Sequence, residues 1–158
     1  MVRFATLLTA GLIGSLGLSA CSGSSSEGAG DDWLESVHTF MNQEIDPAAD
    51  GIWGAAGYII TEAGEQSLFP TTDEGWDGVI ESADRLIALS AELEATKYSR
   101  DETDWIVYAQ GLAAASEQVK TAANERDEEA VFEAGGLLYR VCLSCHERYR
   151  APEGADAP

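Results

Sequence analysis

Apolar residues recur every three or four positions along most of this chain, which is the spacing of one face of an α-helix. The first such stretch begins near Asp31, and its apolar positions are Leu34, Val37, Met41, Ile45, Ile52, Ala56, Ile59 and Ile60. Pro47 interrupts it, because proline removes one helical hydrogen bond and clashes with the preceding turn. The apolar positions resume in phase after the proline. We therefore expect one long helix with a kink near Pro47.

Three further stretches have the same helical spacing. Thr71 and Glu74 have the spacing of a capping box, which predicts a helix start there and an end near Thr96. Ser99 or Asp101 would cap the next helix, and a polar turn at 124–127 would end it. The apolar positions of the three helices are Trp76, Val79, Ile80, Ala83, Ile87 and Leu93, then Trp105, Tyr108, Leu112, Ala115, Val119 and Ala122, then Val131, Gly135, Leu138, Cys142, Cys145 and Tyr149.

The fold class follows from these four stretches and their short connections. Alternation with a period of two residues is not sustained anywhere, so we expect no strands. Short loops favour antiparallel neighbours. The sequence therefore predicts an all-α, antiparallel up-down four-helix bundle over residues 31–150, followed by a disordered tail at 151–158.

The N-terminal segment differs from the rest of the chain in composition. Arg3 precedes an apolar run that is shorter than the roughly 20 residues of a membrane-spanning helix, so residues 1–20 read as a signal peptide. The end of this run, Leu18-Ser19-Ala20-Cys21, resembles the bacterial lipobox, which implies lipidation of Cys21; a plain signal peptide cut after Ala20 is the alternative. Residues 21–30, rich in Ser and Gly, would be a flexible tether. We expect a domain on the periplasmic side of a bacterial membrane, held by a lipid anchor alone. Ser22 after the cysteine favours the outer membrane.

Charge narrows the choice of partners. The chain has 28 Asp and Glu against 9 Lys and Arg, a formal net charge of −19. Phosphate binding needs a basic surface, so nucleic acid is excluded as a partner. The acidic surface of this chain favours solubility and would steer the protein toward a basic partner.

The strongest chemical signal is Cys142-Leu143-Ser144-Cys145-His146. Two cysteines three positions apart, followed at once by histidine, are the attachment motif of c-type haem. Cys142 and Cys145 would each form a thioether with one vinyl group, and His146 would be the proximal iron ligand. On a helix these positions are i, i+3 and i+4 and share one face. We therefore expect one covalently attached haem c.

Two other uses of the cysteines are open. A thioredoxin-like redox site requires a βαβ context, and no strand-like run flanks the motif. A zinc site normally requires four ligands, and beyond the motif the chain offers only Cys21 and His38 as further soft ligands. A zinc site or a disulfide is therefore a weaker interpretation than haem.

The motif lies close to the C-terminal end of a helical chain of this size, and it continues as His146-Glu147-Arg148-Tyr149-Arg150. In these features the chain resembles the class II c-type cytochromes, the cytochrome c′ group, over about residues 31–150. It departs from that family at Val141, where the family has a basic residue. The resemblance implies a four-helix-bundle monohaem cytochrome whose distal haem face is covered by the first helix.

Members of the family differ in the residue that the first helix places at the distal side of the iron, and the candidate in this chain is Met41. Members with a methionine at this place are six-coordinate electron carriers, whereas others leave the iron five-coordinate and bind NO or CO. We expect Met41 to be the distal ligand, with His38 as the alternative. Electron transfer is therefore the predicted function, and a five-coordinate protein for gas scavenging or sensing is the alternative.

Other residues have supporting parts in this prediction. Arg148 and Arg150 are candidates to pair with the haem propionates through guanidinium forks, or they simply favour the helix dipole at its C-terminal end. We assign the four tryptophans to core and haem-wall packing.

No distal His–Arg pair is evident, so we expect an electron carrier without catalytic residues. The redox partner would have a basic docking surface, and a homodimer through the face of Gly51, Gly54 and Gly57 is open.

Overall fold

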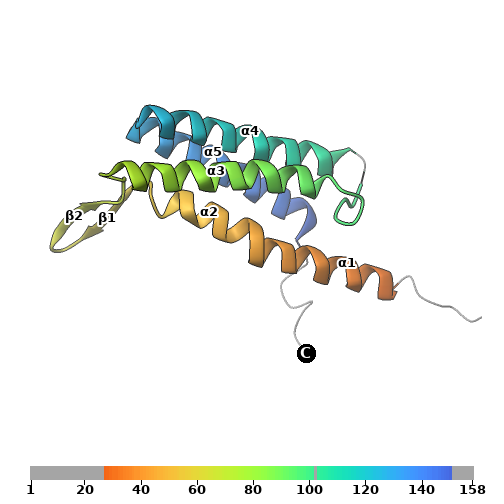
Figure 1. The fold of residues 1–158 in the computed structure, drawn as a ribbon. Helices are drawn as coiled ribbons and strands as arrows, with labels where there is room; N and C mark the ends of the chain where they lie inside the picture. The colour runs from red at the N-terminus through yellow and green to blue at the C-terminus, as the bar shows by residue number, and fades with distance from the viewer. Residues whose placement is uncertain (1–26, 102, 151–158) are drawn as a thin grey trace, which may run out of the picture.

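The first helix runs from Glu27 to Trp53 in three segments (Figure 1). The computed structural model describes residues 27–101 and 103–150, so the signal segment, Cys21 and the C-terminal tail lie outside the described residues. Helix α1 spans Glu27–Phe40, the π-helical turn η1 spans Met41–Ile45, and helix α2 spans Asp46–Trp53. The predicted irregularity near Pro47 is thus a widened turn that ends just before the proline.

The π turn has a recognisable hydrogen bond and a local cause. The backbone N–H of Asp46 donates to the carbonyl of Met41, five residues earlier instead of four. Pro47 has no N–H to donate to the preceding turn, and its ring would crowd a carbonyl there. A widened turn relieves this crowding while the chain stays helical, with φ and ψ in the right-handed region at Ile45 and Asp46.

Helix α3 (Asp73–Leu93) begins one residue later than the predicted capping box implies. Its N-cap is Thr72, whose hydroxyl accepts a hydrogen bond from the backbone N–H of Gly75 at 3.2 Å. The expected Thr71–Glu74 pair is therefore wrong by one position. Of the two adjacent threonines only Thr71 has a glutamate three positions later, so the path of the chain after Pro70, and not the sequence pattern, selects Thr72 as the cap.

Carboxylates lie at the starts of helices α4 (Asp104–Glu125) and α5 (Glu128–Tyr149). The N-cap of α4 is Thr103, two positions after the expected Asp101, and its side chain makes no capping bond; Asp101 instead accepts hydrogen bonds from the backbone N–H groups of Thr103 and Trp105. Asp127 accepts one from Ala130 at 3.0 Å. Each carboxylate satisfies an otherwise unpaired N–H group and lies at the positive end of the helix dipole.

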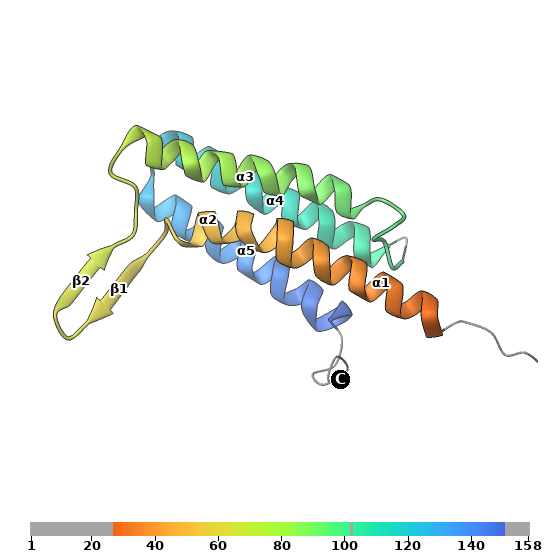
Figure 2. The same cartoon turned by 60° about the horizontal axis from the view of Figure 1, so that its bottom comes forward.

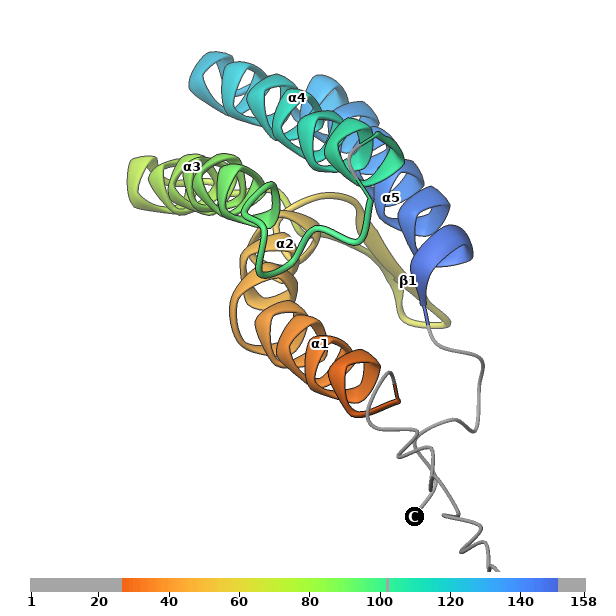
Figure 3. The ribbon, with the colours of Figure 1, turned by 90° about the vertical axis from the view of Figure 1, so that its right-hand side faces the viewer.

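The four helices run in alternating directions, and the core lies between them (Figures 1 and 3). The closest neighbours are α3 with α4, α4 with α5, and α2 with α3. Side chains with almost no exposure fill the centre: Ile52, Val79, Leu86, Leu89, Val119, Val131 and Leu138. The mostly helical architecture agrees with the predicted all-α bundle. None of the helices in the described part of the chain is both long and apolar enough to cross a membrane.

A β-hairpin follows α2, and this contradicts the expectation of no strands. Strands β1 (Tyr58–Thr61) and β2 (Gly64–Ser67) pair antiparallel. The helical pattern fails because Gly57 has φ +112° and Gly64 has φ +130°, values that glycine adopts readily and a helix does not. Ile59 and Ile60, which the helical pattern places on the buried face, are instead exposed on the hairpin.

Candidate cofactor site

A cavity of about 370 Å³ separates the first helix from α5, with α4 and the end of α3 forming its floor. This size is within the range of pockets for small molecules. α5 packs mainly against α4, and Figure 3 shows α1 and α5 lying apart. The cavity is lined by Met41, Ile45, Asp46, Ala49, Trp53, Leu93, Trp105, Tyr108, Ala109, Leu112, Tyr139, Val141, Cys142, Leu143, Cys145, His146, Glu147 and Arg150.

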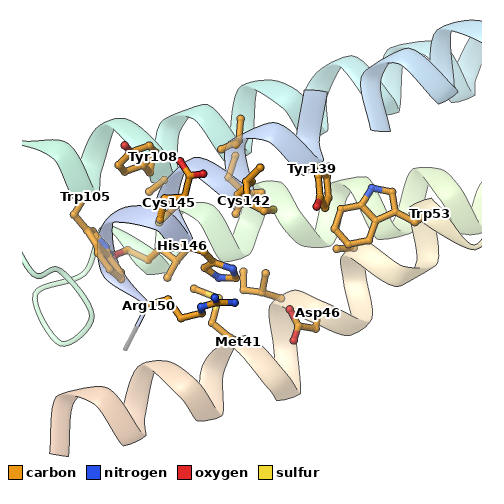
Figure 4. A pocket seen from close by; sticks show the side chains of 18 residues that line it. Met41, Asp46, Trp53, Trp105, Tyr108, Tyr139, Cys142, Cys145, His146 and Arg150 are labelled. Carbon is orange, nitrogen blue, oxygen red and sulfur yellow. Dashed lines mark hydrogen bonds between the residues drawn. The ribbon is translucent and has the colours of Figure 1, made fainter. Parts of the chain in front are cut away.

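One wall of the cavity is the last part of α5. Cys142, Cys145 and His146 all line it, as their positions i, i+3 and i+4 predict for one face of a helix (Figure 4). Both cysteines are half-buried free thiols, and His146 is exposed. Upstream on the same face, Val131, Gly135 and Leu138 are buried in the bundle. The apolar stripe of α5 therefore packs in the core in its first half and lines the cavity in its second half.

Burial sets the protonation of the two thiols. Removal from water raises the pKa of Cys145 to about 11, with a smaller contribution from neighbouring Cys142. Burial also raises the pKa of Cys142, and the Asp46 carboxylate across the cavity adds to this shift. Both thiols therefore stay protonated at neutral pH.

The opposite wall comes from η1 and α2. Met41, Ile45, Asp46, Ala49 and Trp53 line it, and Figure 4 shows Met41, His146 and Arg150 converging between the first helix and α5. Met41 is half-buried at this wall. A methionine from the first helix thus shares a cavity with a histidine of α5, about a hundred positions later in the chain.

The π turn explains how Met41 and Trp53 come to line the same wall. In an uninterrupted α-helix, twelve positions correspond to a rotation of about 120° away from the starting face, at roughly 3.6 residues per turn. The π turn contains one residue more than an α-helical turn, so the separation of Met41 and Trp53 corresponds to about eleven α-helical steps. The rotation between the two side chains about the helix axis is then roughly 20°. The two side chains are thereby brought to one face, and both line the cavity.

Each end of the cavity is closed by aromatic side chains. At one end the indole N–H of Trp53 donates to the carbonyl of Gly135 at 3.2 Å, which ties α2 to α5. At the other end the Trp105 ring contacts Trp33 and Tyr149, with centroids 5.7 and 5.0 Å apart. Trp105 also donates to the carbonyl of Leu93 at 2.7 Å. These contacts hold the walls of the cavity in place.

Tyr149 connects the end of α5 to the loop before α4. Its hydroxyl donates to the carboxylate of Asp101. This bond lowers the pKa of Asp101, and the N–H of Trp105 contributes further. Burial raises the pKa of Tyr149 to about 12, and its bond to Asp101 acts in the same direction. The motif helix is thereby held at its C-terminal end.

The other predicted site residues differ in where they lie. His38 is exposed, interacts with Asn42 at 3.1 Å, and is not among the residues that line the cavity. Arg148 also lies outside that lining and forms an ion pair with Asp104 at 3.2 Å. Arg150 does line the cavity. Cys21 lies outside the described residues.

The sequence-based prediction missed part of the cavity wall. The sequence pattern assigns neither Asp46 nor Tyr139 to the cofactor site, although both line the cavity. Trp53 and Trp105 agree with the expectation that tryptophans line the cofactor wall. Asp46 and Trp53 are spaced i, i+7 within α2 and therefore share a face, and the phase change at the π turn brings that face into line with Met41.

The donor set fits haem better than a bare metal ion. Within residues 27–101 and 103–150, no three His, Cys, Asp or Glu side chains are grouped to hold a metal ion, whereas a structural zinc site needs four ligands. Haem brings its own four nitrogen donors and needs from the protein only axial ligands and, for the c type, two thiols. The cavity supplies two thiols on one helical turn, the adjacent His146 and the facing Met41.

Comparisons of the chain with protein-family models, curated proteins and solved structures returned no match. The function must therefore be argued from the residues of the cavity themselves.

Proposed function

We propose that this protein is a monohaem c-type cytochrome that transfers electrons. The observation that carries the proposal is a single cavity bordered by two half-buried thiols, an adjacent histidine and, from the opposite helix, a methionine. Cys142 and Cys145 would hold haem c through thioethers, His146 would be the proximal ligand and Met41 the distal one. When bound, the haem iron would alternate between Fe(III) and Fe(II).

The chain's own residues would tune the site in three ways. Met41 would raise the reduction potential relative to a second histidine ligand. Trp53, Trp105 and Leu112 would keep water from the cofactor, and a site of low polarity disfavours the more highly charged oxidised state. Arg150 at the cavity would pair with a propionate. Arg148 is the weaker candidate for that contact because its guanidinium pairs with Asp104.

The proposed location rests on the sequence alone. Lipidation of Cys21 would anchor the domain on the periplasmic side of a membrane, where c-type haem is attached in bacteria. This requirement for an exported chain agrees with the signal-like segment before Cys21.

Haem attachment is tested by producing the full chain in a bacterial host that has a c-type haem maturation system. We expect the denatured protein to retain one haem, measured by intact mass and by the pyridine haemochrome spectrum. A C142A/C145A double variant should lose the covalent haem, whereas C21A, which removes the remaining cysteine, should keep it. A wild-type chain without covalent haem would contradict the proposal.

Electron transfer is tested on the same protein by its spin state and ligand binding. Six-coordinate iron predicts low-spin spectra in both oxidation states, reversible reduction, and slow or absent CO binding. A high-spin ferrous spectrum with prompt CO binding would instead support the gas-binding alternative.

A further inference from the structure

The β-hairpin projects from the bundle at the end opposite to the start of α1 (Figure 2). All eight strand residues are exposed, and three of the four residues of β1 are large and apolar: Tyr58, Ile59 and Ile60, with 53, 46 and 77 % of their surface exposed. An isolated two-stranded hairpin is only marginally stable in water. The Tyr58 ring contacts Phe69, with centroids 5.6 Å apart, but the exposed strands show that little other packing covers this element.

The free edge of β1 is the apolar edge of the hairpin. The N–H of Leu68 donates to the carbonyl of Gly57 at 3.0 Å, and Tyr58 faces Ser67 across the ladder. Backbone groups in an antiparallel pair point alternately toward and away from the partner strand. Those of Tyr58 and Ile60 therefore face outward, and no third strand pairs with them among the residues that the structure describes.

The surroundings of this edge extend the apolar surface onto the bundle. Phe132 of α5 is 56 % exposed and lies against Gly57 at the base of the hairpin. Exposed apolar residues gathered in one place mark interaction sites more often than scattered ones do. His146 lies fourteen positions further along α5, about 21 Å away at 1.5 Å per residue, so a partner on the hairpin would leave the cavity open.

Charge decides which partner fits the edge. The only carboxylates between positions 58 and 67 are Glu62 and Glu65, and no basic residue lies in this range. A second copy would bring together two chains that each have a net charge of −19. Anionic lipid would likewise be repelled. A basic segment would be attracted.

We propose that the outer edge of β1 is a docking site for an extended, basic segment of a partner protein. The segment adds as a third strand, so that main-chain hydrogen bonds give affinity and its alternate apolar side chains cover Tyr58 and Ile60. Its basic side chains then lie on the opposite face of the added strand and are attracted by the negative charge of the chain, −19 in all. This inference does not depend on haem attachment.

The test uses the full chain, labelled with nitrogen-15, and two short probe peptides. One alternates Lys with Val and can form a strand; the other alternates Lys with Pro, has the same charge and cannot. We expect the Lys-Val peptide to shift the amide resonances of Tyr58 and Ile60 and to bind at least ten times more tightly than the Lys-Pro peptide. Equal binding of both would overturn the proposal, because charge alone would then account for it.

Matched variants separate docking from general attraction. I59S/I60S keeps every charge, and it should weaken Lys-Val binding at least tenfold. V107S removes an equally exposed apolar side chain from α4 and should leave binding unchanged. If I59S/I60S binds like the wild type, or if sedimentation shows a wild-type dimer that I59S/I60S abolishes, the proposed occupant is wrong.

Discussion

At the residue scale, Met41 is the position on which the proposed function depends most. It lies on the π turn and lines the same cavity as His146, whereas His38, the other candidate ligand, lies outside that lining (Figure 4). Of the two candidate distal ligands in the proposed function, Met41 therefore borders the cavity and His38 does not.

Replacing Met41 with Ala should convert the iron from low to high spin and allow prompt CO binding, because the distal ligand would be lost while His146 remained. Absorption and electron paramagnetic resonance spectra of the variant measure this. H38A is the control and should keep the wild-type spectrum. Low-spin iron in M41A together with high-spin iron in H38A would assign the ligand to His38.

The Tyr149–Asp101 bond predicts how stability depends on pH. Asp101 has a lowered pKa in the folded state, so its contribution is present above the ordinary value of 3.8 and is lost as pH falls through the lowered pKa. The pKa of Tyr149 is raised to about 12, so its contribution is present below pH 10 and is lost between pH 10 and about 12. Chemical unfolding across the pH range measures both losses.

Y149F is the variant that isolates this bond. It should reduce the loss of stability between pH 10 and 12, to which the raised pKa values of Lys97 and Lys120 also contribute, and it should raise the pKa of Asp101 toward its ordinary value. If wild type and Y149F have the same pH dependence, the hydroxyl does not hold the end of α5.

At the element scale, glycines in α2 and in the turn that follows it approach other parts of the same chain. A Cβ at Gly51 would lie 2.3 Å from the Ser82 Oγ and 3.1 Å from its Cβ, so α2 and α3 depend on glycine for their close approach. Gly57 lies against Phe132. Two of the three glycines named for a homodimer thus have intrachain neighbours, and the homodimer remains a prediction.

This packing predicts opposite effects for two Gly-to-Ala changes. G51A should destabilise the protein by about 1–3 kcal/mol, because overpacking outweighs the gain in helix propensity. G78A should stabilise it by up to about 1 kcal/mol, since Gly78 is inside α3 and has open space around it. Urea unfolding of both variants measures the difference, and a stabilised G51A would show that Ser82 can move aside.

At the scale of the whole molecule, the net charge of −19 governs encounters with partners. The five ion pairs among the described residues lie at the surface and contribute little to stability. Excess negative charge acts over distances comparable to the Debye length, about 10 Å at 0.1 M salt. The net charge therefore affects the rates of association with partners rather than the fold.

Electron exchange with a basic protein should therefore slow by at least about tenfold between 10 mM and 500 mM salt. Exchange with ferricyanide, a small anion, should become faster over the same range because repulsion is screened. Stopped-flow mixing with each reagent measures the two slopes. A basic reagent whose rate does not depend on salt would show that the acidic surface does not steer encounters.

The sequence by itself determined the features that depend on local periodicity and covalent spacing. Four amphipathic stretches predicted the helices, and the Cys-x-x-Cys-His spacing placed three side chains on one face. Both inferences depend only on the geometry of a single helix. The assignment of the cofactor remains a prediction from that spacing.

Tertiary structure decided what depends on the path of the chain. It replaced the expected end of the first helix with a hairpin, because positive φ at Gly57 and Gly64 outweighs the apolar phase of Ile59 and Ile60. It moved the cap of α3 from Thr71 to Thr72, and it brought Asp46 and Trp53 to the cavity through the π turn. It also gathered Met41 and His146 at one cavity from opposite ends of the chain. No local pattern encodes such a meeting, because it results from how four helices pack against one another.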